Sequence, residues 1–277
     1  MEAAPILSSS NSSVRSRLVA IDPTFEDVLK STLDRIDAFD PTIALFWETA
    51  GVREKVDTYC LRYVAVLYEL YVKEEKELSR LPDVLAVQLL CCITWRLFDN
   101  CLDGHTEKSK AYFDSLVSFT HLYRFSESCM GTSPHAPLER HYRAMTNAAW
   151  QELEAPLPLS RIWERCAIFL FAIETVATLN PDSVTLYKDY INYSGLAHDA
   201  HDLYSDLASG IKSLPAHWIR ELDEDRVFSE RSVGRLYDRI RSEVTDLEQH
   251  FSSSDFEKSY PMQYSLLHDS REAFRRN

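Results

Sequence analysis

The stretch PDVLAVQLLCCITWRLFDNCLDG, residues 82–104, decides the fold class of this chain. Pro82 and Gly104 stand where proline and glycine typically begin and end an α-helix. Between them, apolar side chains occupy nearly every face of the helix, which is typical of a helix at the centre of a bundle. The stretch therefore predicts a long, buried core helix.

Two further stretches give the same kind of signal. Ser160 is placed to cap a second apolar helix, RIWERCAIFLFAIETVATL, residues 161–179. NPDS, residues 180–183, restarts the chain into a third helix that Gly210 ends. With only 6 glycines, with 11 prolines that lie largely at junctions, and with no run of alternating apolar residues, the sequence favours an all-α protein.

The domain organisation follows from the absence of a long linker. Residues 1–20 are rich in serine and asparagine and predict a flexible amino-terminal arm. Residues 21–277 predict a single-domain helical bundle with short connections.

Composition excludes several classes of partner. The chain has 277 residues, 45% of them hydrophobic, which is ample for a sizeable core. Its 43 acidic and 30 basic residues give a net charge of -13, which argues against a nucleic-acid backbone as the partner. The longest uninterrupted apolar run, CAIFLFAI at residues 166–173, is too short to span a bilayer, so we expect no stable membrane insertion.

The six cysteines form no CxxC pair and fall mostly within helical stretches, at Cys60, Cys91, Cys92, Cys101, Cys129 and Cys166. This pattern favours buried free thiols over a disulfide framework or a zinc site. We therefore expect a reducing, cytoplasmic location.

The core helix ends in two like charges, Asp99 and Asp103. Residues four apart lie on one side of a helix, about 40° apart around its axis. An isolated pair of this kind is also typical of a helix that emerges into solvent. The pair alone is weak support for a site.

A second acidic cluster, HDAHDLYSD at residues 198–206, strengthens the functional interpretation. His198, Asp202 and Asp206 follow one helical stripe, and Asp199 lies beside it. Carboxylates from two helices of an apolar bundle are the ligands that hard divalent cations require. The two clusters together predict a magnesium site.

The order of these features resembles the class I isoprenoid synthase fold, which includes terpene cyclases. An apolar helix ends in an aspartate-rich motif, and a second acidic helix follows about a hundred residues later. FDNCLD resembles the DDxxD motif of the family, with Asn100 in place of the second aspartate. HDAHDLYSD is similar to the second metal-binding motif of terpene cyclases, with His198 in the first place and Asp206 in the last. Small fungal sesquiterpene cyclases of the humulene-synthase type are a looser likeness.

The resemblance implies three Mg²⁺ ions that hold the diphosphate of a prenyl substrate, farnesyl diphosphate being favoured by the short chain. The implied metal ligands are Asp99, Asp103, Asp202 and Asp206, with His198 or Asp199 as further ligands. Arg161 is the first candidate for the arginine that senses the diphosphate, and Arg165, Lys212, Arg271 and Arg275 are further cations for that job. The resemblance also implies that the chain can form a homodimer.

An allylic cation needs an apolar cavity lined by aromatic faces. Trp95 and Phe98 on the first helix, together with Phe169, Phe171, Tyr63 and Tyr68, form the pool from which such a lining is expected. For each of these side chains, ordinary core packing is the competing interpretation.

Other functions stay open from the sequence. DNCLD and DLYSD both have the DxxxD form of squalene and phytoene synthases, and GIKSLP after the second motif is similar to a basic segment of those enzymes. A chain-elongating prenyl transferase is a weaker alternative, because no arginine pair follows the first motif. A non-catalytic helical scaffold is the alternative from a different class.

Overall fold

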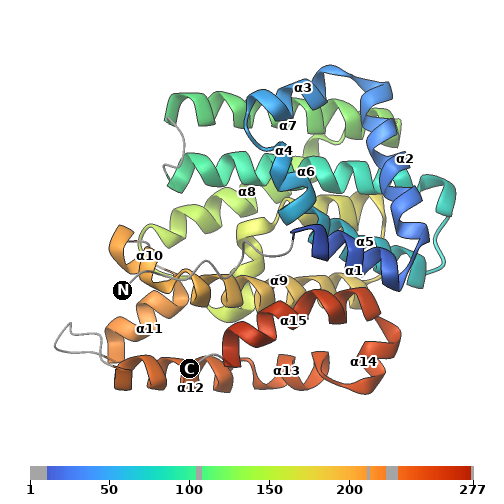
Figure 1. Cartoon of the computed structure of the whole chain (residues 1–277). Coiled ribbons are helices and arrows are strands. Elements are labelled where there is room, and N and C mark those ends of the chain that lie inside the picture. The colour runs from blue at the N-terminus through green and yellow to red at the C-terminus, as the bar shows by residue number, and fades with distance from the viewer. Residues whose placement is uncertain (1–10, 104–107, 211–212, 223–229, 276–277) are drawn as a thin grey trace. The chain divides into compact units, whose positions relative to one another are not determined.

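The computed structural model describes residues 11–103, 108–210, 213–222 and 230–275. It is 86% helix, and the residues in these ranges contain no strand (Figure 1). The all-α class is therefore confirmed.

The chain divides into two compact units, each described here by itself. Unit 1 comprises Met1–Glu139 and Ile168–Asn180, and unit 2 comprises Arg140–Ala167 and Pro181–Asn277. The single domain predicted over residues 21–277 stays a prediction. The amino-acid composition does not reveal the boundaries between the units. The chain passes from one unit to the other within α8 (His135–Glu152) and at two short connections, and not through a linker.

Unit 1 is built around its longest apolar helix, α6. Its elements are α1 (Asn11–Ile21), α2 (Thr24–Phe39), α3 (Thr42–Thr49), α4 (Arg53–Lys55), the π-helix η1 (Val56–Cys60), α5 (Leu61–Lys73), the 3-10 helix η2 (Leu78–Arg80), α6 (Leu81–Asp103), α7 (Lys108–Met130), the start of α8 (His135–Glu152) and the π-helix η4 (Phe171–Val176). α6 packs against α2, α5, α7, η1 and η4 (Figure 1). Residues 84–95 are all buried. The predicted core helix is confirmed.

The second half of the expected amino-terminal arm is helical. Residues 11–20 lie in α1, where Val14 and Leu18 are 2% and 0% exposed. These two side chains are four residues apart and share one face of the helix, so their burial holds α1 in place. Residues 1–10 lie outside the described residues.

Judged by length and composition alone, the helical segment Leu78–Leu102 is long enough and apolar enough to cross a membrane. Polar residues such as Gln88 and Arg96 interrupt this segment, so it contains no uninterrupted apolar run of that length. In the structure, 78% of its most apolar window is buried within the protein. A core helix of a soluble protein has the same properties.

All six cysteines are free thiols. Cys60, Cys91, Cys92 and Cys166 are buried, whereas Cys101 and Cys129 are partly exposed. Burial raises the pKa of Cys91 and Cys92.

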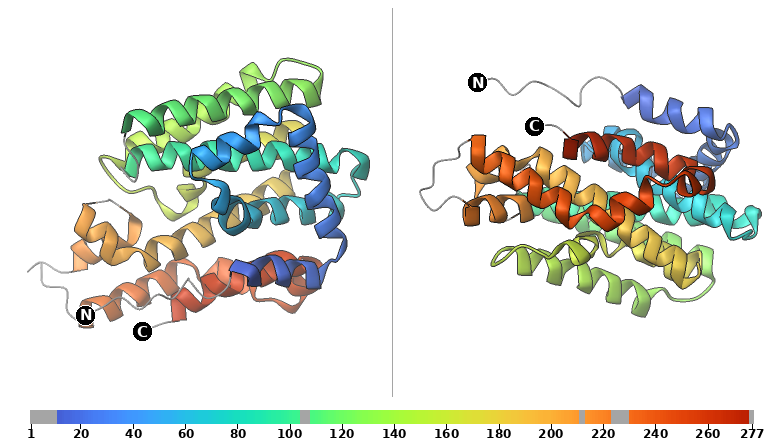
Figure 2. Two further views of the ribbon diagram at one scale, coloured as in Figure 1. Left: turned by 45° about the horizontal axis from the view of Figure 1, so that its top comes forward. Right: turned by 90° about the horizontal axis from the view of Figure 1, so that it is seen from below.

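Unit 2 is arranged around α9. Its elements are most of α8, the 3-10 helix η3 (Leu159–Cys166), α9 (Pro181–His201), α10 (Leu203–Ser209), α11 (Leu214–Leu222), α12 (Glu230–Glu243), α13 (Thr245–Phe251), α14 (Ser254–Ser259) and α15 (Pro261–Arg275). α9 packs against η3, α11 and α15, and α15 contacts α12, α13 and α14 (Figure 2). α9 thus carries the second acidic motif at the end of a buried helix.

The predicted apolar helix over residues 161–179 is wrong in its local structure. The chain forms η3, a turn and the π-helix η4 in place of one α-helix. The Asn192 side chain on α9 accepts a hydrogen bond from the Trp163 backbone N–H at 2.8 Å and so supplies a tertiary partner within η3. Such interruptions by 3-10 and π turns often occur at functional segments.

Candidate functional site

The first acidic motif has a cation beside it. Arg96 Nη1 donates to Asp99 Oδ2 at 2.7 Å, and the two side chains are 20% and 25% exposed. Arg96 is not among the predicted site residues, although its position three residues before Asp99 places it on the same side of the helix. Asp103 ends α6, and its side chain lies outside the described residues. The motif therefore contains a partly buried ion pair, with Asp99 as its acid.

An aromatic cluster lies one helical turn before Asp99. Trp95 on α6 stacks on Tyr59 of η1 with ring centroids 5.3 Å apart, and it meets Phe169 edge-on at 5.9 Å. Tyr63 lies 4.8 Å from Phe169 and 5.3 Å from Tyr59, again between ring centroids. Unit 1 thus brings four aromatic rings together on the approach to the first motif.

Tyr63, Trp95 and Phe169 belong to the pool of lining side chains that the sequence predicts, and Tyr59 does not. The spacing of Tyr59 to Tyr63 nevertheless places both on the same side of the chain. Phe98 is half-buried and Phe171 fully buried. Tyr68 has a structural role: its hydroxyl donates to Asp22 at 2.6 Å. Burial, with Asp22 as the next cause, raises the pKa of Tyr68 to about 12.

The second motif is interrupted at its centre. α9 ends at His201 and α10 begins at Leu203, because Asp202 leaves helical geometry with φ -89° and ψ 6°. His201 Nδ1 lies 2.7 Å from Asp202 Oδ1, and His198 Nδ1 lies 3.5 Å from Asp202 Oδ2. Gly210 ends α10 with a φ of 75°, which confirms the predicted end of this helical segment. The motif therefore spans the end of the long helix α9 and the start of the short helix α10.

Asp206 is a buried acid of the motif, with 8% of the residue exposed, as is Asp199. Burial raises the pKa of Asp206, and the charges of Asp199 and Asp202 raise it further. The Ser213 hydroxyl and His198 act in the opposite direction. The fold thus brings the acids of residues 198–206 close enough to repel one another.

Arg165 and Asp199 are held by each other and by Glu152. Arg165 Nη1 donates to both carboxylate oxygens of Asp199 at 2.8 Å, and its Nε donates to Glu152 Oε1 at 2.7 Å. Burial alone would lower the pKa of Arg165, but the charges of the two acids outweigh it and raise this pKa. Burial raises the pKa of Glu152 in spite of the nearby arginine. This triad gives Arg165 and Asp199 a structural role.

Arg161 lies on the exposed side of η3. Its Nε and Nη2 donate to Glu164 at 2.6 and 2.7 Å, and its side chain is 45% exposed. Hydrogen bonding to Glu164 raises the pKa of Arg161. The first candidate for the diphosphate-sensing arginine is thus paired with an acid three residues later. Lys212 lies outside the described residues, as does the side chain of Arg275.

The second motif offers carboxylate oxygens, which are the ligand atoms that magnesium prefers. Within the described residues, no group of three or more His, Cys, Asp or Glu side chains is gathered closely enough to hold a metal ion. Mg²⁺ usually keeps several waters and takes one or two carboxylates together with substrate phosphates. Asp202 and Asp206 fit that requirement as a pair, since a cation would offset both the burial of the Asp206 charge, which is the main cause of its raised pKa, and the smaller effect of the Asp202 charge.

The first motif belongs to unit 1 and the second to unit 2. Their convergence on one substrate therefore stays a prediction. Comparisons of the chain with protein-family models, with curated protein sequences and with solved structures found no match.

Proposed function

We propose that this protein is a magnesium-dependent class I terpene cyclase. It would ionise farnesyl diphosphate, cyclise the resulting allylic cation to a sesquiterpene and release diphosphate. The observation that carries the proposal is the cluster of Tyr59, Tyr63, Trp95 and Phe169 one helical turn before Asp99. Aromatic faces attract cations. A carboxylate at the end of the same helix would bind the metal ion that holds the leaving diphosphate.

The acids of both motifs have defined roles in this proposal. Asp99 and Asp103 would hold magnesium from one side, and Asp202 with Asp206 would hold it from the other. When bound, Mg²⁺ neutralises the charge that develops on the leaving diphosphate. Arg96 and Arg161 are the cations of this chain that would donate hydrogen bonds to diphosphate oxygens, each being held in place by an acid three residues later.

The apolar part of unit 1 would handle the hydrocarbon. Trp95 is 8% exposed and Phe169 is fully buried, so water has little access to the rings. Exclusion of water protects a carbocation from premature capture, and the ring faces stabilise its charge. A central apolar cavity belongs to this proposal as the place where the chain of the substrate folds.

Product analysis tests the proposal directly. The purified chain is incubated with farnesyl diphosphate and Mg²⁺, and the organic extract is analysed by gas chromatography and mass spectrometry. Asp99→Ala and Asp202→Ala are each expected to abolish sesquiterpene formation while the helical circular dichroism stays unchanged.

Asp238→Ala is the matched control, because Asp238 pairs with Arg241 at 2.6 Å on a helix surface much as Asp99 pairs with Arg96. This variant is expected to keep full activity. Full activity in Asp99→Ala would remove that residue from the site, and absence of any product from the unaltered chain would contradict the cyclase assignment.

Ligand-dependent stability distinguishes an enzyme from a helical scaffold. Mg²⁺ and diphosphate together are expected to stabilise the folded chain by about 2.7 kcal/mol when the ligand is present at a hundred times its dissociation constant. EDTA is expected to abolish this effect. A scaffold has no reason to respond to both ligands.

The DxxxD form shared by residues 99–103 and 202–206 favours a second candidate, a head-to-head condensing enzyme of the squalene and phytoene type. Such an enzyme joins two prenyl chains. A thirty-carbon product from farnesyl diphosphate, with no fifteen-carbon hydrocarbon, would establish the condensing activity in place of the cyclase.

A further inference from the structure

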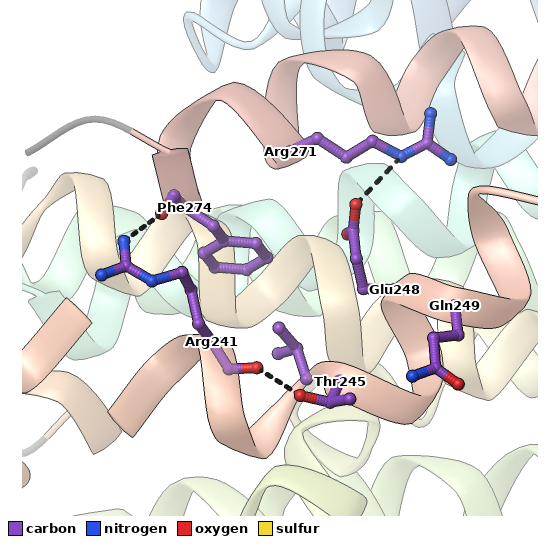
Figure 3. A pocket seen from close by; sticks show the side chains of 7 residues that line it. Arg241, Thr245, Glu248, Gln249, Arg271 and Phe274 are labelled. Atoms are coloured by element: carbon purple, nitrogen blue, oxygen red, sulfur yellow. Dashed lines mark hydrogen bonds and ion pairs between the residues drawn. The ribbon is translucent and has the colours of Figure 1, made fainter. Parts of the chain in front are cut away.

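A hollow lies in unit 2 among α12, α13 and α15, and no residue of either acidic motif is among those that line it (Figure 3). Its volume is about 310 Å³, which is at the small end of the range for ligand sites. The lining consists of Arg241, Val244, Thr245, Glu248, Gln249, Arg271 and Phe274. The hollow therefore combines two guanidinium groups with an aliphatic and an aromatic side chain.

Arg271 is the unusual member of this lining, since its side chain is only 6% exposed. The guanidinium donates from Nη2 to the backbone carbonyl of Phe251 and lies over the ring of Tyr264, 4.3 Å from the centroid. Its Nε–H is buried and has no hydrogen-bond acceptor, because the nearest carboxylate, Glu248, is 3.8 Å away. A buried donor without an acceptor is costly, so an acceptor atom of a ligand at this position would be stabilising.

Glu248 offsets only one of the two positive charges that line the hollow. Its carboxylate oxygens already accept hydrogen bonds from the Tyr193 hydroxyl and from the Ser252 hydroxyl. Arg241 on α12 adds a second cation, bound to Asp238 at 2.6 Å on the exposed side of the helix. In a chain with a net charge of -13, a hollow lined by two arginines and one glutamate is a local site for an anion.

The apolar part of the lining determines the rest of the ligand. Val244 and Phe274 are 2% and 3% exposed, and Figure 3 shows the Phe274 ring between the two arginines. We propose that this hollow binds a small amphiphilic oxyanion, whose charged oxygens accept hydrogen bonds from Arg271 Nε and Arg241 and whose short hydrocarbon group contacts Phe274 and Val244. This proposal does not depend on the terpene cyclase assignment.

The test follows the Arg271 Nε–H resonance by ¹H–¹⁵N NMR in the full chain. Monobutyl phosphate is the probe, inorganic phosphate lacks the hydrocarbon group, and 1-butanol lacks the charge. Monobutyl phosphate is expected to shift the resonance saturably and to bind about tenfold more tightly than inorganic phosphate, since the butyl group leaves water. Butanol is expected to have no effect.

Arg241→Gln is the decisive variant, because replacing the buried Arg271 can itself unfold the unit. Loss of a charge-assisted hydrogen bond is expected to weaken binding of monobutyl phosphate about tenfold. Arg235→Gln removes an exposed arginine from the same helix and is expected to leave the affinity unchanged. No shift with monobutyl phosphate, equal binding of inorganic phosphate, or unchanged affinity in Arg241→Gln would each overturn the proposal.

Discussion

The ion triad of Arg165, Asp199 and Glu152 permits a quantitative test of the packing of unit 2. Arg165→Met keeps much of the apolar stem and leaves two carboxylates without their cation. Removing one partner of a buried ion pair costs about 3–5 kcal/mol. Because the three side chains are 20%, 10% and 20% exposed, we expect the lower end, about 3 kcal/mol.

Arg161→Met is the matched control, because Arg161 lies on the same 3-10 helix and pairs with a single acid at the surface. Exposed pairs contribute less than about 1 kcal/mol. Urea denaturation of both variants at pH 7, followed by circular dichroism, measures the difference in the free energy of unfolding. Far-UV spectra without denaturant check that both variants fold.

The pH dependence of the Arg165→Met variant identifies the cause of its instability. Burial already raises the pKa of Glu152, and loss of the Arg165 charge, which opposes this effect, raises it further above the unfolded value. The penalty is therefore largest above the folded-state pKa of Glu152 and is relieved as the pH is lowered from 7 to about 5. A loss below about 1 kcal/mol, or a loss that does not change with pH, would refute the triad as the source of stability.

Two further predictions concern packing and titration in unit 2. A methyl group on Gly195 would lie 2.7 Å from Ile162 Cγ2, so Gly195→Ala is expected to destabilise the protein by about 1–3 kcal/mol. A methyl group on Gly234 would have nothing within 4 Å, so Gly234→Ala is expected to stabilise the protein by about 1 kcal/mol. Thermal denaturation measures both variants, and equal effects would contradict the close contact at Gly195. Burial and nearby positive charges lower the pKa of His141 to about 4, so its contribution to stability is present above pH 6.5 and is lost as the pH falls toward 4. His141→Gln is expected to flatten that part of the pH–stability curve, and an unchanged slope would exclude His141 as its source.

The long helices were predictable because their signals are local. Proline and glycine bracket α6, and the observed bounds, Leu81–Asp103, differ from the expected ones by a single residue at the start. Residues 161–179 show the limit of this approach. Their apolar character predicts burial, which is correct, but the hydrogen-bond register there involves Asn192, a residue from another helix. Periodicity along one segment contains no information about such a partner.

The candidate site shows the same limit. The spacing of residues 198–206 predicts that its acids lie near one another, and in the structure the charges of Asp199 and Asp202 act on Asp206. Nothing in the spacing indicates that Asp199 is bound by Arg165, which lies 34 residues earlier. Likewise, Tyr59 joins the aromatic cluster through stacking on a helix that follows it in the chain. Roles decided by tertiary partners were beyond the sequence.

The order in which the units appear along the chain affects how this protein is made. Unit 1 includes Phe169 and Phe171, both fully buried, and these residues are synthesised only after Arg140–Ala167, which belong to unit 2. On the ribosome, the hydrophobic core of unit 1 therefore stays incomplete until residue 180 has emerged. During that interval its unfilled apolar surface is available to chaperones, and a release of the chain before this point would yield an aggregation-prone fragment.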